Sequence, residues 1–120
     1  MTRYSVVDIE ALEGEGPGGA VRKLRRELGA TAFGFNHFRL PPGVTGREHD
    51  HADDGQEEVY VVLKGSGVMR VDDDEIELRP GIVVRVEGLA TRVPVAGGDG
   101  LEFVTFGAPV EGRYVPPEWG

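Results

Sequence analysis

Short apolar runs separated by clusters of glycine, proline and aspartate dominate the chain. The clearest runs lie at residues 31–40, 59–63, 68–71, 76–78, 82–86, 92–95 and 101–106. Pro41-Pro42-Gly43 ends the first run, Lys64-Gly65-Ser66-Gly67 ends the second, and Asp72-Asp73-Asp74 marks a hairpin tip. Some seven to nine short strands, with turns about every ten residues, predict an all-β sandwich or barrel.

Two of these runs, 59–63 and 82–86, are apolar on both faces instead of alternating with polar residues. Such strands need cover on both sides of the sheet. They favour a closed barrel that has a second layer or a partner chain outside it. Because only one face of the run 59–63 can line a single small barrel, we expect a homodimer that buries part of the other face.

The two ends of the chain are less regular. Residues 4–9 form a possible short strand, and the glycine-rich loop 13–19 is flexible by composition. Residues 21–28 fit either a short edge strand or a helical turn. Near the C-terminus, Tyr114 and Trp119 flank a proline pair, and we expect this tail to pack on a surface of the domain.

Length, charge and cysteine content narrow the function classes. A chain of 120 residues is long enough for one domain with a real core. Its formal net charge of −8, without a basic cluster, argues against nucleic acid or an anionic membrane as a partner. The lack of cysteine excludes thiol catalysis and zinc–thiolate sites. No apolar stretch approaches the roughly 18 residues of a membrane span, and no signal-peptide layout is seen, so we expect a soluble, cytoplasmic protein.

Candidate chemistry is concentrated between residues 43 and 65. His49 and His51 stand two residues apart, so in an extended segment both imidazoles point to the same face. Glu58 follows and opens the run 59–63, where it can bring a carboxylate to the same place. Two histidines and one carboxylate are a ligand set of catalytic zinc, iron, manganese and nickel sites. These three residues are therefore candidate ligands of a divalent transition metal.

The same stretch resembles the first motif of the cupin family. In that motif a glycine is followed after five residues by His-x-His, then by a glutamate, six further residues and a second glycine. The matching residues here are Gly43, His49, His51, Glu58 and Gly65. The resemblance covers about residues 31–107 and implies an all-β jelly-roll barrel, the cupin double-stranded β-helix. Residues 1–30 would then form an N-terminal edge segment and residues 108–120 a C-terminal tail.

The spacing inside the motif departs from the family. Six residues, 52–57, separate His51 from Glu58, where the family has three or four. We expect this acidic, glycine-containing stretch to be a mobile loop that gates the mouth of the barrel. A second register, counted back from Glu58, would place His51 and Asp53 in the two histidine positions. The proline–glycine turn that precedes the motif favours the register with His49 and His51.

The second cupin motif keeps its spacing but not its residues. Counted from Gly81, Arg92 stands where the family has its last metal-binding histidine. A guanidinium is always charged and has no lone pair to donate. Any metal would therefore keep three protein ligands at most, unless His37 contributes. We interpret His37 as a packing or interface residue, because alternation along 31–40 places it with Phe33 and Phe35.

Two hypotheses from different function classes follow. The first is a small metal-dependent enzyme, of the dioxygenase or isomerase type known among cupins, in which Arg92 holds an anionic metabolite. The second is a metal-free small-molecule binding module in which Arg92 pairs with Glu58 or with the ligand. A metal-free isomerase with one histidine as general base lies between them. Tyr60 shares a face with Glu58, and we expect it to line the ligand cavity.

Overall fold

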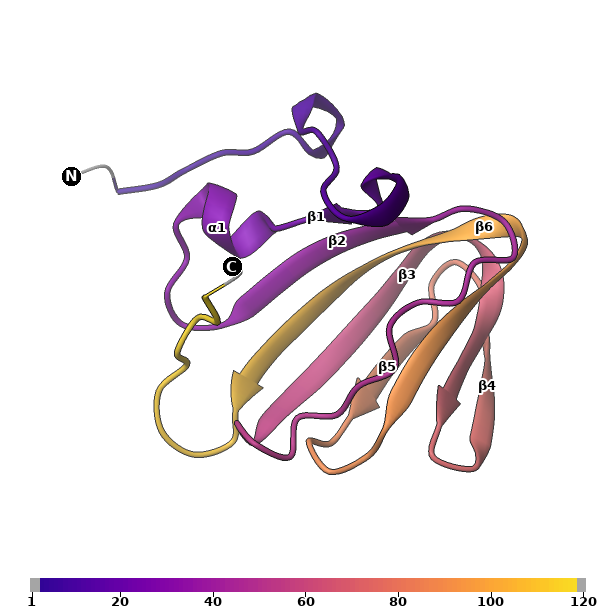
Figure 1. The fold of residues 1–120 in the computed structure, drawn as a ribbon. Helices are drawn as coiled ribbons and strands as arrows, with labels where there is room; N and C mark the ends of the chain where they lie inside the picture. The colour runs from indigo at the N-terminus through magenta and orange to yellow at the C-terminus, as the bar shows by residue number, and fades with distance from the viewer. Residues whose placement is uncertain (1–2, 119–120) are drawn as a thin grey trace.

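The computed structural model describes residues 3–118, so Trp119 of the predicted tail lies outside the described residues. Antiparallel strands make up most of the structure, with short helical elements near the N-terminus (Figure 1). In chain order the elements are η1 (Ile9–Ala11), η2 (Pro17–Gly19), β1 (Val21–Arg22), α1 (Leu24–Leu28), β2 (Gly34–Leu40), β3 (Gln56–Val71), β4 (Asp74–Leu78), β5 (Val83–Val86) and β6 (Arg92–Pro109).

Two long strands, β3 and β6, form the frame of the molecule. They pair antiparallel over nearly their whole length, from Gln56 opposite Pro109 to Val71 opposite Arg92. β2 extends the sheet beside the second half of β6. β5 pairs with the first half of β3, and β4 pairs with its second half. Because the long strands bend (Figure 1), the sheet curls around a single core.

The bends coincide with glycine-rich segments where the sequence predicts strand ends. The predicted end at 64–67 is wrong, because β3 continues through two shifts of register on either side of Gly65. A Cβ atom at Gly65 would lie 2.1 Å from the carbonyl oxygen of Gly100, and the φ angle there is +86°. Only glycine fits such a close strand crossing. The predicted break at 97–100 likewise lies inside β6.

The N-terminal predictions are corrected in two places. Residues 4–8 form no strand, and Ile9 begins the 3-10 turn η1. For segment 21–28 the sequence allows either an edge strand or a helical turn. The structure contains both, one after the other, since β1 is followed by α1. The hairpin tip between β3 and β4 is confirmed, with Asp72 in the left-handed region at a φ of 51°. No helix within residues 3–118 is long and apolar enough to cross a membrane.

The core lies inside the curled sheet. Alternate residues of β3 face inward, so Tyr60 and Val62 are both 2% exposed. They join Met69 of the same strand and side chains from the other strands, among them Leu78, Val84, Val86, Leu101 and Phe103. The inward rows of β2, β6 and β3 therefore form one continuous and mostly apolar floor, on which the candidate site is built.

The outward face of the sheet carries large apolar side chains that the single chain leaves uncovered. Val83 is 61% exposed, Leu63 40%, and Phe33 and Phe106 nearly as much. Phe35 stacks on Phe106 with ring centroids 4.5 Å apart. Leu63 and Val83 belong to the two runs, 59–63 and 82–86, whose two-sided apolar character predicts a partner chain. The homodimer stays a prediction.

His37 is a fully buried residue of the outward face, which agrees with its interpretation as a packing residue. Its Nε2 atom lies 3.3 Å from Oε2 of Glu102, which also binds Arg39. Neither ring nitrogen makes a well-directed hydrogen bond to the described residues. Burial lowers the pKa of His37 below its ordinary value of 6.5, although the Glu102 carboxylate opposes this shift.

We predict that replacing His37 by leucine changes how stability depends on pH. The folded protein holds the imidazole neutral, whereas the unfolded chain takes up a proton as the pH falls through 6.5. The native protein therefore loses stability on acidification through this group, and His37→Leu lacks that loss. We would measure the free energy of unfolding of both proteins with urea at pH 7.5 and at pH 5.5. Relative to the native protein, His37→Leu should be more stable at pH 5.5 than it is at pH 7.5. An identical difference at both pH values would contradict this account.

Candidate metal centre

An extended segment before β3 supplies two of the candidate ligands. His49 exchanges two backbone hydrogen bonds with Arg92 at the start of β6, of 3.0 and 2.9 Å. The backbone nitrogen of His51 donates to the Gly88 carbonyl at 2.8 Å. These contacts hold the segment extended, so His49 and His51 both face the barrel interior, as the sequence predicts.

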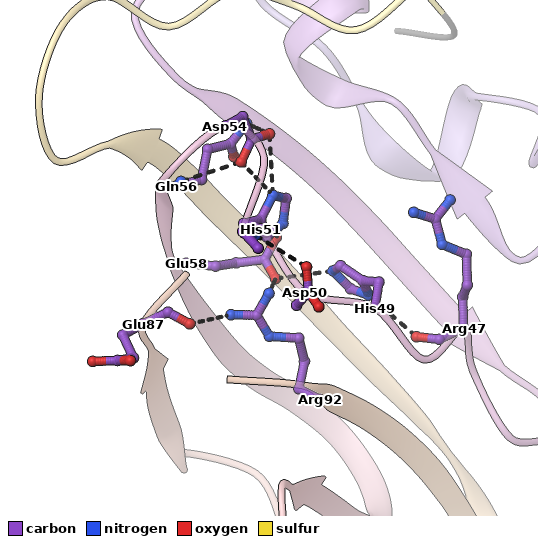
Figure 2. A network of polar contacts seen from close by, with 10 residues as sticks. Arg47, His49, Asp50, His51, Asp54, Gln56, Glu58, Glu87 and Arg92 are labelled. Atoms are coloured by element: carbon purple, nitrogen blue, oxygen red, sulfur yellow. Dashed lines mark hydrogen bonds and ion pairs between the residues drawn. The ribbon is translucent and has the colours of Figure 1, made fainter. Parts of the chain in front are cut away.

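The three candidate ligands converge. One ligand atom from each of His49, His51 and Glu58 lies within 4.8 Å of the others. The Nε2 atoms of His49 and His51 approach different oxygens of the Glu58 carboxylate, at 3.5 and 3.6 Å. Figure 2 shows both rings directed at that carboxylate from neighbouring positions on the segment. The structure thus brings together the three residues of the His49/His51 register. Asp53, the ligand of the alternative register, is exposed and is not a member of this group.

The unsatisfied atoms of this group fit a metal ion. Nε2 of His51 and Oε1 of Glu58 are buried, and neither has a hydrogen-bond partner within residues 3–118. Four tetrahedral ligands at metal–ligand distances of about 2.1 Å are about 3.4 Å apart, close to the observed nitrogen–oxygen separations. Buried polar atoms without partners are rare in folded proteins. Nitrogen and carboxylate donors at this spacing suit a divalent transition metal.

The other ring nitrogen of each histidine is held by a neighbour. Nδ1 of His49 lies 3.2 Å from the Arg47 carbonyl oxygen. Nδ1 of His51 contacts both oxygens of Asp54, at 3.0 and 3.2 Å. With Nδ1–H donating to these acceptors, the lone pair of each neutral ring lies on Nε2 and points at the common centre.

The electrostatics of the site favour an ionised glutamate. Burial would raise the pKa of Glu58, but the His49 and His51 imidazoles, with the Tyr60 hydroxyl, outweigh it and hold that pKa well below its usual range. The Glu58 carboxylate in turn raises the pKa of His51, against the effect of burial. Burial, and then the charge of Glu58, raise the pKa of Tyr60, so its hydroxyl stays protonated.

Arg92 lies at the same site, but on the far side of Glu58. It is fully buried, and its Nη2 donates to the Glu87 carbonyl oxygen at 2.8 Å. Its Nη1 lies 4.0 Å from Oε1 of Glu58 (Figure 2). It is absent from the residues that line the cavity. The structure places Arg92 beside Glu58, as the sequence predicts. The role of Arg92 in holding a ligand stays a prediction.

Residues 52–57 are less of a loop than the sequence predicts. Gln56 and Glu57 already belong to β3, and Gln56 is only 8% exposed. Asp54 accepts hydrogen bonds from the backbone and the side-chain amide of Gln56, at 3.2 and 3.0 Å, while it contacts His51. Residues 52–57 therefore contact the candidate ligand His51 through Asp54. Sequence reasoning missed Asp54, although an acidic residue three positions after a candidate histidine is a signal for such support.

A cavity of about 960 Å³ opens beside the three candidate ligands. Tyr60 lines it, as predicted, together with Asn36 and Phe38 of β2. Tyr114 of the C-terminal tail also lines it and packs against Gly34 of β2, which agrees with a tail that packs on the domain. His37 points to the opposite face of β2 and is not among the lining residues, so it cannot serve as a further ligand.

The sequence family described as "Cupin domain" matches residues 36–102, more than half of the chain. This chain belongs to the cupin family. Among solved structures, a cupin protein from Bacteroides fragilis superposes with a TM-score of 0.78 at 23% identity, covering 98% of this chain and 93% of that one. A predicted oxalate decarboxylase from Thermotoga maritima superposes with a TM-score of 0.73 at 22% identity, covering 86% and 97%. These likenesses confirm the all-β jelly-roll fold of this cupin, and at such identities they show the fold alone.

One curated relative is similar in sequence to this cupin. It is the dimethylsulfoniopropionate lyase DddW of Ruegeria pomeroyi, 36% identical over 76 residues. The match covers 63% of this chain but only 43% of the relative, so this cupin matches less than half of that protein's length.

We predict that Asp54→Ala lowers the affinity of this cupin for Zn²⁺ by roughly 10–100-fold, the usual cost of losing a carboxylate that orients a histidine ligand. Asp54→Asn keeps a hydrogen-bond acceptor and should lose less. Asp53→Ala is the matched control, because Asp53 is an exposed neighbour that forms no ion pair or hydrogen bond within residues 3–118. Calorimetric Zn²⁺ titration of all four proteins measures the effect. Equal affinities for the Asp54→Ala and Asp53→Ala proteins would contradict it.

Proposed function

We propose that this cupin is a metal-dependent enzyme that acts on a small metabolite inside the barrel. His49, His51 and Glu58 hold a divalent transition metal, of the zinc, manganese, iron or nickel type. The observation that carries the proposal is the convergence of three donor side chains, two of which, His51 and Glu58, hold a buried donor atom without a hydrogen-bond partner among the described residues. A catalytic metal typically has few protein ligands, so that positions remain open for substrate.

The side chains around the centre have separable roles in this proposal. A bound metal supplies Lewis acidity, which polarises an oxygen of the substrate. His49 and His51 present Nε2 because their Nδ1 atoms are held by Arg47 and Asp54. Glu58 contributes the negative charge of the ligand set. Tyr60, whose hydroxyl stays protonated, stabilises the ionised Glu58 carboxylate from the cavity wall.

The reaction type is a choice among three classes. Dioxygenase and isomerase chemistry are both found among cupins, and the name of the Ruegeria pomeroyi relative adds lyase chemistry. Only a part of that relative is matched, so lyase activity on dimethylsulfoniopropionate is a proposal to be assayed for this chain. The cavity of about 960 Å³ accommodates a small metabolite of any of these classes.

A second candidate function rests on Arg92. Its guanidinium is 4.0 Å from Glu58 and supplies a positive charge at the place of the missing histidine. Such a pair neutralises the carboxylate without any metal. In this alternative the protein is a metal-free binding module, and Arg92 is the cation that closes the site.

Calorimetry on the native chain and on Arg92→His distinguishes the two functions. Residue 92 lies directly opposite His49 in a backbone bridge, so a histidine there reaches the same side of the barrel. If the native protein holds a metal, Zn²⁺, Mn²⁺ and Ni²⁺ should bind it, and Arg92→His should alter their affinities only modestly.

Glu58→Gln provides the control for the ligand assignment. Loss of a direct ligand should weaken metal binding by more than the roughly 10–100-fold expected of a supporting residue. Absence of metal binding by the native chain, followed by tight binding in Arg92→His, would contradict the enzyme proposal and support the metal-free module.

A further inference from the structure

The cavity needs a cation other than Arg92 if it is to hold an anionic ligand. Arg92 is fully buried behind Glu58, with one guanidinium nitrogen committed to the Glu87 carbonyl. It does not line the cavity. Its charge therefore compensates Glu58 and is not presented to a ligand.

Arg47, unlike Arg92, lies on the wall of the cavity. It precedes His49 by two residues in the same extended segment, so its side chain shares the face of the two histidines. It lines the cavity together with them. Figure 2 shows its side chain extending past His49, with only its backbone carbonyl engaged by that ring. No ion pair joins its guanidinium to a carboxylate within residues 3–118.

The other cation on the cavity wall is already engaged. Nζ of Lys23 lies 3.9 Å from Oε1 of Glu15. Asp50 and Asp53 also line the cavity, so its mouth is not uniformly positive. Any anion that binds there would therefore need direct contact with a guanidinium, because long-range attraction to an acidic chain is lacking.

The cavity floor carries an independent sign of a ligand. Asn36 of β2 lines the cavity, opposite Thr105 of β6, and its Oδ1 atom is buried without a hydrogen-bond partner among the described residues. This amide oxygen accepts a hydrogen bond, so it suits an N–H or O–H donor elsewhere on a bound molecule and not the carboxylate of that molecule. Much of the remaining wall is apolar. The rings of Phe38 and Phe103 stack there with their centroids 5.0 Å apart.

We propose that Arg47 is the substrate-anchoring residue of this cavity and that the ligand class is a small organic carboxylate. Its planar guanidinium binds a carboxylate through two parallel hydrogen bonds, and the apolar wall receives the hydrocarbon part. This inference names the substrate class of the proposed enzyme and rests on that proposal for the identity of the site. The binding event itself requires no metal and is measured without one.

The test uses butyrate as the probe, with butyramide as its uncharged analogue. Each is titrated into chelator-treated and into Zn²⁺-loaded ¹⁵N-labelled protein, and binding is followed by NMR chemical shifts. We expect butyrate to shift resonances of cavity residues in both forms, and to bind about tenfold or more tightly than butyramide. Arg47→Gln should remove that preference, and Arg47→Lys should restore it only in part because the bidentate contact is lost.

Arg79→Gln is the matched control, because it removes the same charge from an exposed residue outside the cavity. It should leave butyrate binding unchanged. Arg47→Gln should also keep the native melting temperature, since the side chain is exposed.

The outcomes separate this inference from the proposed function. Butyrate binding that is unaffected by Arg47→Gln, or that occurs only in the Zn²⁺-loaded form, would overturn the role of Arg47 while leaving the metal site intact. Arg47-dependent butyrate binding in a protein that takes up no metal would support the inference and contradict the proposed enzyme.

Discussion

The burial of one carboxylate, that of Glu58, is the constraint on which the rest of the site depends. A buried charge is costly unless opposite charges or hydrogen-bond donors compensate it. Here two imidazoles and one guanidinium surround a side chain that is 12% exposed. The fold supplies this environment because Glu58 sits on β3 between β5 and β6. The pairing of β6 with the extended segment brings His49 to it from the other direction.

The replacement of a ligand histidine by Arg92 divides the site into two layers. The guanidinium compensates Glu58 from behind, inside the protein, and the imidazoles face the cavity. A three-ligand metal centre on the cavity side and a fixed positive charge behind it are compatible. Arg92 lies 4.0 Å from Oε1 of the carboxylate, too far for a hydrogen bond, so that oxygen keeps a free lone pair for a metal. In the proposed function, the substrate binds to the segment that carries Arg47 and both histidines.

The sequence predicts the candidate metal ligands better than it predicts the residues that hold those ligands in place. Alternation in an extended segment is enough to place His49 beside His51, and motif spacing is enough to bring Glu58 and Arg92 to them. The link between Asp54 and His51 depends on how a tight turn folds, which residue types alone do not define. The continuity of β3 and β6 through their glycine segments was missed for a similar reason. Glycine permits either a turn or a bulge, and the choice is made by the strand that crosses there.

The proposed enzyme requires that His49, His51 and Glu58 hold a metal in the native protein. The most direct measurement is elemental analysis of the untagged chain, purified without a nickel column, beside a His49→Ala/His51→Ala variant prepared in the same way. We expect about one divalent transition-metal ion per native chain and almost none in the variant, because imidazole donors dominate the affinity of such sites. A native protein that carries no more metal than the variant, and takes up none on dialysis against Zn²⁺, Mn²⁺ or Ni²⁺, would contradict it.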